Sequence, residues 1–288
     1  MNLKEIKLRI QSVKNTQKIT SAMKMVSAAK LRRAQLAIEN MRPYEGHLSQ
    51  MLSNLLASGT GVKTQYTRVA EPKRVALVVV SSSTNLCGAF NANIIRAAKD
   101  IIADYSAAGV EVEIFPVGKK IADALKKAGH AACNGLLLEQ AGAVDYSVVS
   151  GVAAIFMERF VAGELDRVEL LYTHFGNSSG QAIAKEQFLP ISLEEFAGNA
   201  NTLADFILEP SEEVLIRELL PKVIKLRLFT ALLDSAAAEH SARMIAMQIA
   251  TDNAGDLISE LVVEYNKGRQ QAITNELLDM ASGSSAAR

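Results

Sequence analysis

The sequence predicts an α/β fold in which long N- and C-terminal helices form an antiparallel left-handed coiled coil, with a central Rossmann-like α/β domain between them. Three observations support this. Apolar residues recur every three or four positions at both ends of the chain, as in coiled coils. In the middle, short β-branched runs alternate with helical patterns, which is typical of βαβ units. There is no Trp, and Ala, Leu, Lys and Glu, which favour helices, dominate both ends.

These patterns divide the chain into three predicted parts. Residues 1–71 form an N-terminal helix with its linker, residues 72–204 form the α/β domain, and residues 205–288 form the C-terminal helix.

The N-terminal helix is predicted from a run of apolar residues at 3-4-3 spacing, which lie on one side of a helix: Leu3, Ile6, Ile10 and Val13. We expect this seam to drift onward through Thr16, Ile19, Met23 and Val26. Pro43 should end or kink the helix, because proline lacks a backbone donor and clashes with the preceding turn. From Leu3 to Met41 the helix would be roughly 60 Å long.

The central domain is predicted to contain a mostly parallel sheet. The expected strands are 74–81, 110–116 and 167–175, and the expected helices are 91–105, 119–128 and 145–162. Residues 182–191 add an antiparallel strand after the turn-forming segment 176–180.

The C-terminal helix has a clear start signal, because Ser211 can cap it and Glu212 and Glu213 supply acids in its first turn. Its seam also has steps of three and four: Leu226, Phe229, Leu233, Ala236, His240, Met244, Met247, Thr251, Ala254, Ile258, Leu261 and Tyr265. From Val214 to Asp279 it would be roughly 100 Å long. His240 is expected to act as a core or register-setting residue rather than as a ligand.

Both seams need a partner, and two helices that leave and return to one domain must run antiparallel. Steps averaging close to 3.5 residues predict a left-handed supercoil. The longer C-terminal helix leaves a tip with an apolar stripe of Ile273, Leu277 and Met280. Such a stripe predicts a socket on another protein, and the alternative is a frayed tail.

The charge of the chain is zero overall but unevenly distributed. Residues 1–35 hold nine basic residues against one acidic residue, a net charge of +8. This predicts an acidic partner, which could be nucleic acid, anionic lipid or protein, unless the charges simply face solvent.

No apolar run approaches the roughly 18 residues that span a bilayer, and the N-terminus lacks a secretory signal. Its basic character leaves a mitochondrial presequence as an alternative.

The sequence offers no catalytic, cofactor-binding or metal site. The segment Ser81–Gly88 follows a predicted strand, where α/β folds bind phosphate, but neither glycine-rich phosphate motif is present. The histidines are scattered, and Cys87 and Cys133 are expected to be reduced thiols. A nucleophilic Cys87 is the alternative, but no base is placed beside it.

Several long motifs resemble those of the gamma subunits of F-type ATP synthases. They are NLKEIKLRIQSVKNTQKITSAMKMVSAAKLRRAQ at 2–35, LCGAFN at 86–91, EHSARMIAM at 239–247, ATDNA at 250–254 and YNKGRQQAIT at 265–274. They keep the order of the family and extend over the whole chain. An α/β nucleotide-binding enzyme would need a phosphate loop, and a coiled-coil nucleic-acid or scaffold protein would not explain these ordered motifs.

The chain departs from the family pattern at two places. Ser83, Thr84 and Asn85 stand where the family usually has Asp-Arg-Gly. We expect Asn85 to preserve the turn, because Asn tolerates a left-handed backbone. Gly268 replaces the usual Ala and should loosen the helix by up to about 1 kcal/mol. The length leaves no room for the regulatory cysteine insertion of the chloroplast type.

The resemblance implies a non-catalytic shaft inside a ring of alpha and beta subunits. With an epsilon subunit, it would rest on a membrane ring of c subunits. Proton flow would turn ring and shaft together, so that the asymmetric shaft imposes different conformations on the catalytic sites of beta. The resemblance further implies no cofactor, no nucleic-acid partner, and peripheral attachment to the cytoplasmic face of the bacterial inner membrane.

The matching motifs assign contacts with partner subunits to six residues: Met23, Lys24, Arg243, Arg269, Gln270 and Thr274. The resemblance implies that Met23 and Lys24 lie beside an acidic loop of beta and that Arg243 faces them from the other helix. The last three residues would meet other loops of beta. Two alternatives remain: Met23 could simply pack in the seam, and Arg243 could make only an interhelical pair.

Overall fold

The computed structural model describes residues 2–57, 64–129, 144–177, 180–192, 209 and 211–286. Contacts within the chain define two compact units, of which the first contains Met1–Ala28 and Arg243–Arg288 and the second contains Ala29–Ala242. The two long helices, α1 (Leu3–Ala57) and α6 (Glu212–Ala286), each contribute one section to each unit.

In the first unit, α1 and α6 pack side by side and run antiparallel. Near the start of α1, Leu3 Cδ2 lies 3.2 Å from the position of a Cβ atom built on Gly268. Further along α1, the hydroxyl of Thr251 donates a 2.8 Å hydrogen bond to the hydroxyl of Thr20. Residue numbers rise along α1 as they fall along α6, which confirms the antiparallel prediction.

The seam of α1 differs from the prediction after Val13. Ile19 and Val26 are 60% and 57% exposed, and Thr16 is exposed as well. Met23 is half-buried, as predicted, but the other inward residues include four polar ones: Gln17, Thr20, Lys24 and Ser27. The prediction was wrong at Thr16, Ile19 and Val26 because it followed apolar residues, whereas the regular spacing from Val13 falls mostly on polar ones.

The seam of α6 is confirmed, because every residue predicted to lie on it is buried or half-buried. The helix begins at Glu212, directly after Ser211, whose carbonyl oxygen accepts a hydrogen bond from the Leu215 amide at 3.1 Å. It extends to Ala286, beyond the predicted end at Asp279.

Pro43 was predicted to end or kink the helix, and it does not end α1, since the helix continues to Ala57. A proline inside a helix costs about 3 kcal/mol. The residues that follow it include Leu48, Leu52 and Leu55, which are all less than 9% exposed. Burying each contributes roughly 1.5–3 kcal/mol, so the burial that continued helix allows outweighs the proline.

The second unit contains a four-stranded sheet in the order β2-β1-β3-β4. β1 (Arg74–Val80) pairs in parallel with β2 (Glu111–Val117) and with β3 (Arg167–Asn177). β4 (Gly180–Leu189) is antiparallel to β3, as predicted. Both parallel neighbours of β1 follow it through helical crossovers, so the alternating sequence pattern gave the correct sheet.

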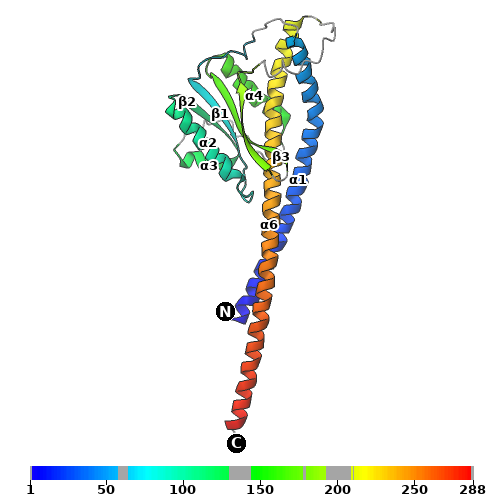
Figure 1. Cartoon of the computed structure of the whole chain (residues 1–288), viewed down its shortest axis with the longest axis vertical. Coiled ribbons are helices and arrows are strands. Elements are labelled where there is room, and N and C mark those ends of the chain that lie inside the picture. The colour runs from blue at the N-terminus through cyan, green and yellow to red at the C-terminus, as the bar shows by residue number, and fades with distance from the viewer. Residues whose placement is uncertain are drawn as a thin grey trace. The chain divides into compact units, whose positions relative to one another are not determined.

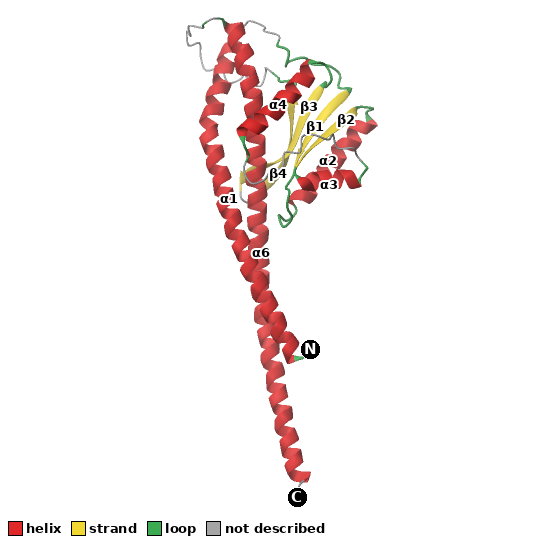
Figure 2. Cartoon of the chain, turned by 180° about the vertical axis from the view of Figure 1, so that it is seen from behind, coloured by secondary structure: helices red, strands yellow, loops and turns green. Residues whose placement is uncertain are grey.

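Helices cover both faces of this sheet, and alternate residues of β1 point to the two sides. Leu77 and Val79 pack beneath α2 (Phe90–Ala107) and α3 (Lys119–Lys127), which lie together on one face in Figure 1. Val78 and Val80 join the core formed with α4 (Tyr146–Val161) and with sections of α1 and α6. Figure 2 shows these layers from behind, with the strands in yellow.

Local signals set the helix boundaries in this unit. Asp145 caps α4, because its carboxylate accepts a 2.8 Å hydrogen bond from the Ser147 amide.

Across the residues that the structure describes, no helix combines the length and apolar character needed to cross a membrane.

Candidate functional site

The carboxyl edge of the parallel strands is the place where open α/β sheets bind ligands. Two serines follow β1 at this edge. The Ser81 hydroxyl accepts a 3.0 Å hydrogen bond from the Ile121 amide in the first turn of α3. Asn91 fixes Ser82 twice: its side-chain oxygen accepts from the Ser82 amide at 3.1 Å, and its amide group donates to the Ser82 hydroxyl at 2.8 Å. These polar groups therefore have partners within the chain.

At the same edge, the backbone between β2 and α3 lies directly against the backbone of Ser81. Gly118 has a φ of 94°, and a Cβ atom at this position would lie 2.2 Å from the carbonyl oxygen of Ser81. Only glycine fits here, because the backbone of the Ser81 segment occupies the space of a side chain.

A section of α6 packs at this edge of the sheet. Cys87 and Phe90 pack against Ala238 and Ala242 of α6, and Phe175 at the end of β3 joins them. The Cys87 thiol is buried and free, and it accepts a 3.1 Å hydrogen bond from the Asn91 side chain. Cys133 lies outside the described residues. The place of a ligand in a doubly wound sheet is thus taken by a helix of the same chain.

The loop after β1 differs from the expectation that Asn85 has a left-handed backbone. Its left-handed residues are Leu86, with a φ of 69°, and Gly88, with a φ of 60°, whereas Asn85 has no positive φ. Position 85 therefore does not need a residue that tolerates a left-handed backbone, and the absence of glycine there leaves the turn intact.

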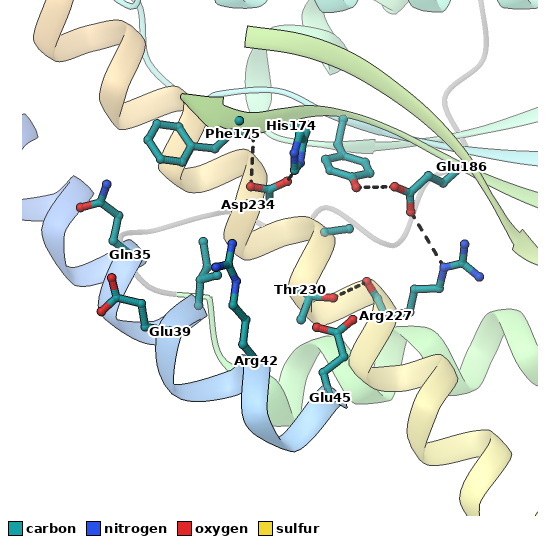
Figure 3. Close-up of a pocket in the computed structure, with 14 residues that line it drawn as sticks. Gln35, Glu39, Arg42, Glu45, His174, Phe175, Glu186, Arg227, Thr230 and Asp234 are labelled. Atoms are coloured by element: carbon teal, nitrogen blue, oxygen red, sulfur yellow. Dashed lines mark hydrogen bonds and ion pairs between the residues drawn. The ribbon is translucent and has the colours of Figure 1, made fainter. Parts of the chain in front are cut away.

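The second unit also contains a polar cavity of about 410 Å³, shown in Figure 3. Sections of α1, β3, β4 and α6 line it with charged and polar side chains, which include Gln35, Glu39, Arg42, Glu45, Tyr172, His174, Glu186, Arg227 and Asp234. No spacing in the sequence predicted this cavity, because its residues come from four separate elements.

Several charged groups in the cavity have a partner within it. The Tyr172 hydroxyl donates a 2.6 Å hydrogen bond to Glu186, which also lies 3.9 Å from Arg227. Asp234 contacts the His174 ring. Burial raises the pKa of Tyr172, and the hydrogen bond to Glu186 adds to this effect. Within the described part of the chain, no group of His, Cys, Asp and Glu is arranged to hold a metal ion.

All six residues assigned to partner contacts lie in the first unit. Arg269, Gln270 and Thr274 are exposed on α6, where the Thr274 hydroxyl donates to the Gln270 carbonyl at 3.0 Å. Met23 and Lys24 are half-buried on α1, and Arg243 is only 9% exposed. Because Thr20 lies opposite Thr251, the register places Arg243 about one helical turn from the level of Met23 and Lys24.

Beyond Gly268, α6 continues past the N-terminal end of α1, as Figure 1 shows. Its apolar stripe is open to solvent, with Ile273 46%, Leu277 61% and Met280 73% exposed. The stripe that the sequence predicted is therefore not covered by the described part of this chain.

Together, these features define a class of protein: two long helices that pack antiparallel in one unit, with an α/β domain in the other unit whose strand edge packs against a section of α6. The family model described as ATP synthase matches residues 2–287. The chain is 50% identical to the ATP synthase gamma chain of Phocaeicola vulgatus, over 99% of each chain. It is 45% identical to that of Flavobacterium johnsoniae, over 99% of this chain and 98% of the relative. The chain therefore belongs to the ATP synthase gamma chain family, the central stalk subunits of F1.

Solved structures agree with this assignment. A chain in the central stalk and c-ring of the Tetrahymena thermophila mitochondrial ATP synthase matches with a TM-score of 0.59 and 26% identity, over 81% of this chain and 99% of that one. A chain in the OSCP, F1 and c-ring assembly of the Euglena gracilis enzyme matches with a TM-score of 0.67 and 19% identity, over 99% and 94%. The second similarity concerns the fold alone.

Proposed function

We propose that this chain turns as a shaft and couples proton flow through a membrane ring to conformational change at the catalytic sites of surrounding beta subunits. A shaft does this without touching nucleotide. It makes different contacts with each neighbour, and each contact biases a conformational equilibrium by its own free energy. The observation that carries this proposal is the exposed length of α6 beyond Gly268, which presents polar and apolar groups on a helix without a partner from α1.

The first contact group is Arg269, Gln270 and Thr274. The guanidinium of Arg269 offers a fixed fork of donors, and the Gln270 amide adds two donors and an acceptor. Both side chains are exposed, so they are available to loops of beta. Contacts of this kind form at one rotary angle and break at the next, which an angle-dependent signal requires.

The second contact group is Met23, Lys24 and Arg243. Ile19 and Val26 are exposed on the same stretch of α1. An outward apolar surface beside a half-buried lysine suits a partner loop that carries both apolar and acidic side chains. This arrangement supports a contact with beta near Met23.

A basic stripe on α1 supports acidic partner surfaces. Lys4, Lys7, Lys14 and Lys18 are all exposed, and their spacing places them along one side of the helix. Among the described residues, none of these lysines has an ion pair. Their charge is therefore available to a neighbouring subunit.

The proposed partners are the alpha and beta subunits of F1, the epsilon subunit and the c-subunit ring. The Tetrahymena and Euglena neighbours belong to assemblies with F1 or the c-ring. The similar chains named above from Phocaeicola vulgatus and Flavobacterium johnsoniae support a place for this one on the cytoplasmic face of a bacterial inner membrane, held there peripherally by the complex.

The test of this function is the double substitution Arg269→Ala with Gln270→Ala in the assembled complex. A hydrogen bond to a charged group contributes roughly 1.5–3 kcal/mol. Losing one in a rate-limiting state should slow steady-state ATP hydrolysis about ten-fold or more.

Arg217→Ala is the matched control, because Arg217 is an exposed arginine of α6 in the second unit. It should leave turnover unchanged. Subunit composition is checked for each complex. Normal turnover in an intact double mutant would show that Arg269 and Gln270 carry no rotary contact.

A further inference from the structure

The polar cavity of the second unit, drawn in Figure 3, has two walls that differ in how their charges are paired. In the wall formed by β3, β4 and α6, Glu186 accepts a hydrogen bond from the Tyr172 hydroxyl and lies 3.9 Å from Arg227. In the same wall, Asp234 contacts the His174 ring. Both carboxylates of this wall therefore have partners within it.

The facing wall belongs to α1, and its polar side chains are not paired in this way. They recur at helical spacing: Gln35, Glu39, Arg42 and Glu45. Among the described residues, none of these four side chains makes a hydrogen bond or an ion pair. In Figure 3, Arg42 and Glu45 extend from α1 toward α6. The α1 wall therefore offers its polar groups to whatever occupies the cavity.

The cavity carries more negative than positive charge. Its lining contains four carboxylates against two guanidinium groups, which gives a net charge of −2 with the histidine neutral. Glu45 is half-buried, and burial raises the pKa of its carboxyl; the charges of Arg227 and Arg42 oppose this effect, and that of Glu186 adds to it. A half-buried carboxylate of this kind is stabilised by a cation placed directly beside it.

The rest of the lining indicates which kind of cation fits. A volume of about 410 Å³ lies within the range of small-molecule sites, roughly 300–1,000 Å³. Ile38, Phe175 and Ala231 add apolar surface to the lining. Glu39 and Glu45 are six positions apart on α1, a rise of about 9 Å along the helix. A metal ion would use the carboxylates alone, whereas a short aliphatic chain with an ammonium group at each end also uses the apolar surface.

We propose that this cavity is a binding site for an aliphatic diamine or polyamine. One ammonium group lies at Glu45 and another at Glu39, and the methylene groups between them pack against Ile38 and Ala231. Each ammonium group donates charge-assisted hydrogen bonds to a carboxylate, which are roughly twice as strong as neutral ones. The bound diamine stabilises the second unit, because it binds the folded form only. The inference does not depend on the proposed rotary function.

The test is calorimetric titration of the full chain with putrescine, at pH 7 and constant ionic strength. We expect saturable binding that is at least about ten-fold weaker in Glu45→Gln, or about 1.4 kcal/mol, because the substitution removes the charge and keeps the shape. Butylamine, which has the same carbon chain and a single ammonium group, should also bind at least about ten-fold more weakly than putrescine. Arg42→Gln should strengthen the binding of putrescine, since it removes a competing cation.

Glu158→Gln is the matched control, because Glu158 is an exposed glutamate of the same unit and does not line the cavity. It should leave the affinity for putrescine within about two-fold of the original. The proposal is overturned by the absence of saturable binding, by equal weakening in the two glutamate variants, by equal affinity for butylamine, or by weaker binding in Arg42→Gln. If Glu45→Gln does not fold, Glu39→Gln provides the same comparison at an exposed position.

Discussion

Gly118 lies between β2 and α3 with a φ of 94°, and the carbonyl oxygen of Ser81 occupies the space where its Cβ atom would be. Gly118→Ala would combine a backbone conformation reserved for glycine with a clash against backbone atoms. We expect the free energy of unfolding to fall by at least about 3 kcal/mol. Denaturant unfolding measures this.

Gly151→Ala is the matched control, because this residue lies in α4 with nothing within 4 Å of its added Cβ atom. It should stabilise the helix by roughly 0.5–1 kcal/mol. Equal stability of the Gly118 variant and the original chain would show that the Ser81 segment can move aside.

Asp166 provides a pH-dependent test. Its carboxylate accepts hydrogen bonds from the amides of Lys73 at 3.0 Å and Arg74 at 2.9 Å. Burial works to raise the pKa of Asp166, but these hydrogen bonds and the charges of Arg74 and Arg68 outweigh it and lower the pKa below the usual 3.8. The ionised form is therefore favoured in the folded chain, and its contribution to stability is present above pH 3.8 and lost below it.

We expect Asp166→Ala to destabilise the chain by about 1–3 kcal/mol at pH 7, because two amides lose their acceptor. The difference from the original chain should shrink as the pH falls through the lowered pKa. Unfolding curves between pH 7 and pH 3 measure it. A difference that stays constant over this range would contradict the assignment of the stabilisation to the ionised carboxylate.

At the scale of elements, a substitution at Gly268 tests how much this glycine weakens the helix α6. Glycine in a helix costs about 0.5–1 kcal/mol relative to alanine. A Cβ atom here would meet the side chain of Leu3, with Cδ2 at 3.2 Å and Cγ at 3.9 Å, and Cδ2 is the far end of a flexible side chain. We therefore expect Gly268→Ala to stabilise this part of α6 by up to about 1 kcal/mol, measured as slower amide exchange. Faster exchange would mean that Leu3 cannot adjust, and Leu3→Ala in the same background would then restore stability.

The elements themselves could be predicted from the sequence, because periodicity is a local signal. The buried run from Val75 to Val80 and the spacing in α6 placed the sheet and the long helix correctly. Apart from Met23, the seam of α1 after Val13 was not predictable in this way, since most of its inward residues are polar. The cavity was also missed, because Glu45, Glu186 and Asp234 come from separate elements that meet only in the folded chain.

At the scale of the whole molecule, the net charge of +8 on residues 1–35 predicts that this segment contacts acidic surfaces of partner subunits. Lys18→Glu with Lys24→Glu should weaken assembly or coupling, because it reverses two charges toward acidic partner surfaces. The difference from the original should shrink at high salt, since Lys18 is exposed, Lys24 is half-buried, and charges open to solvent are screened over about 8–10 Å. Reconstitution of the complex, with ATP-driven proton pumping, measures this at several salt concentrations.

Lys99→Glu with Lys126→Glu makes the same change of charge at exposed lysines of the second unit. A loss equal to that of the first pair would reveal a general effect of net charge. Full assembly and proton pumping by the Lys18 and Lys24 variant at low salt would show that these two lysines make no contact with an acidic partner surface.

The contact of Cys87 and Phe90 with Ala238 and Ala242 has a consequence for how the α/β domain stays on its helix. In the language of binding, α6 is a tethered ligand. The chain keeps it at an effective concentration on the order of millimolar or above, so even a small contact remains occupied. The domain therefore needs no strong intrinsic affinity for the helix. Any small molecule that competes for this edge must overcome a ligand that cannot diffuse away.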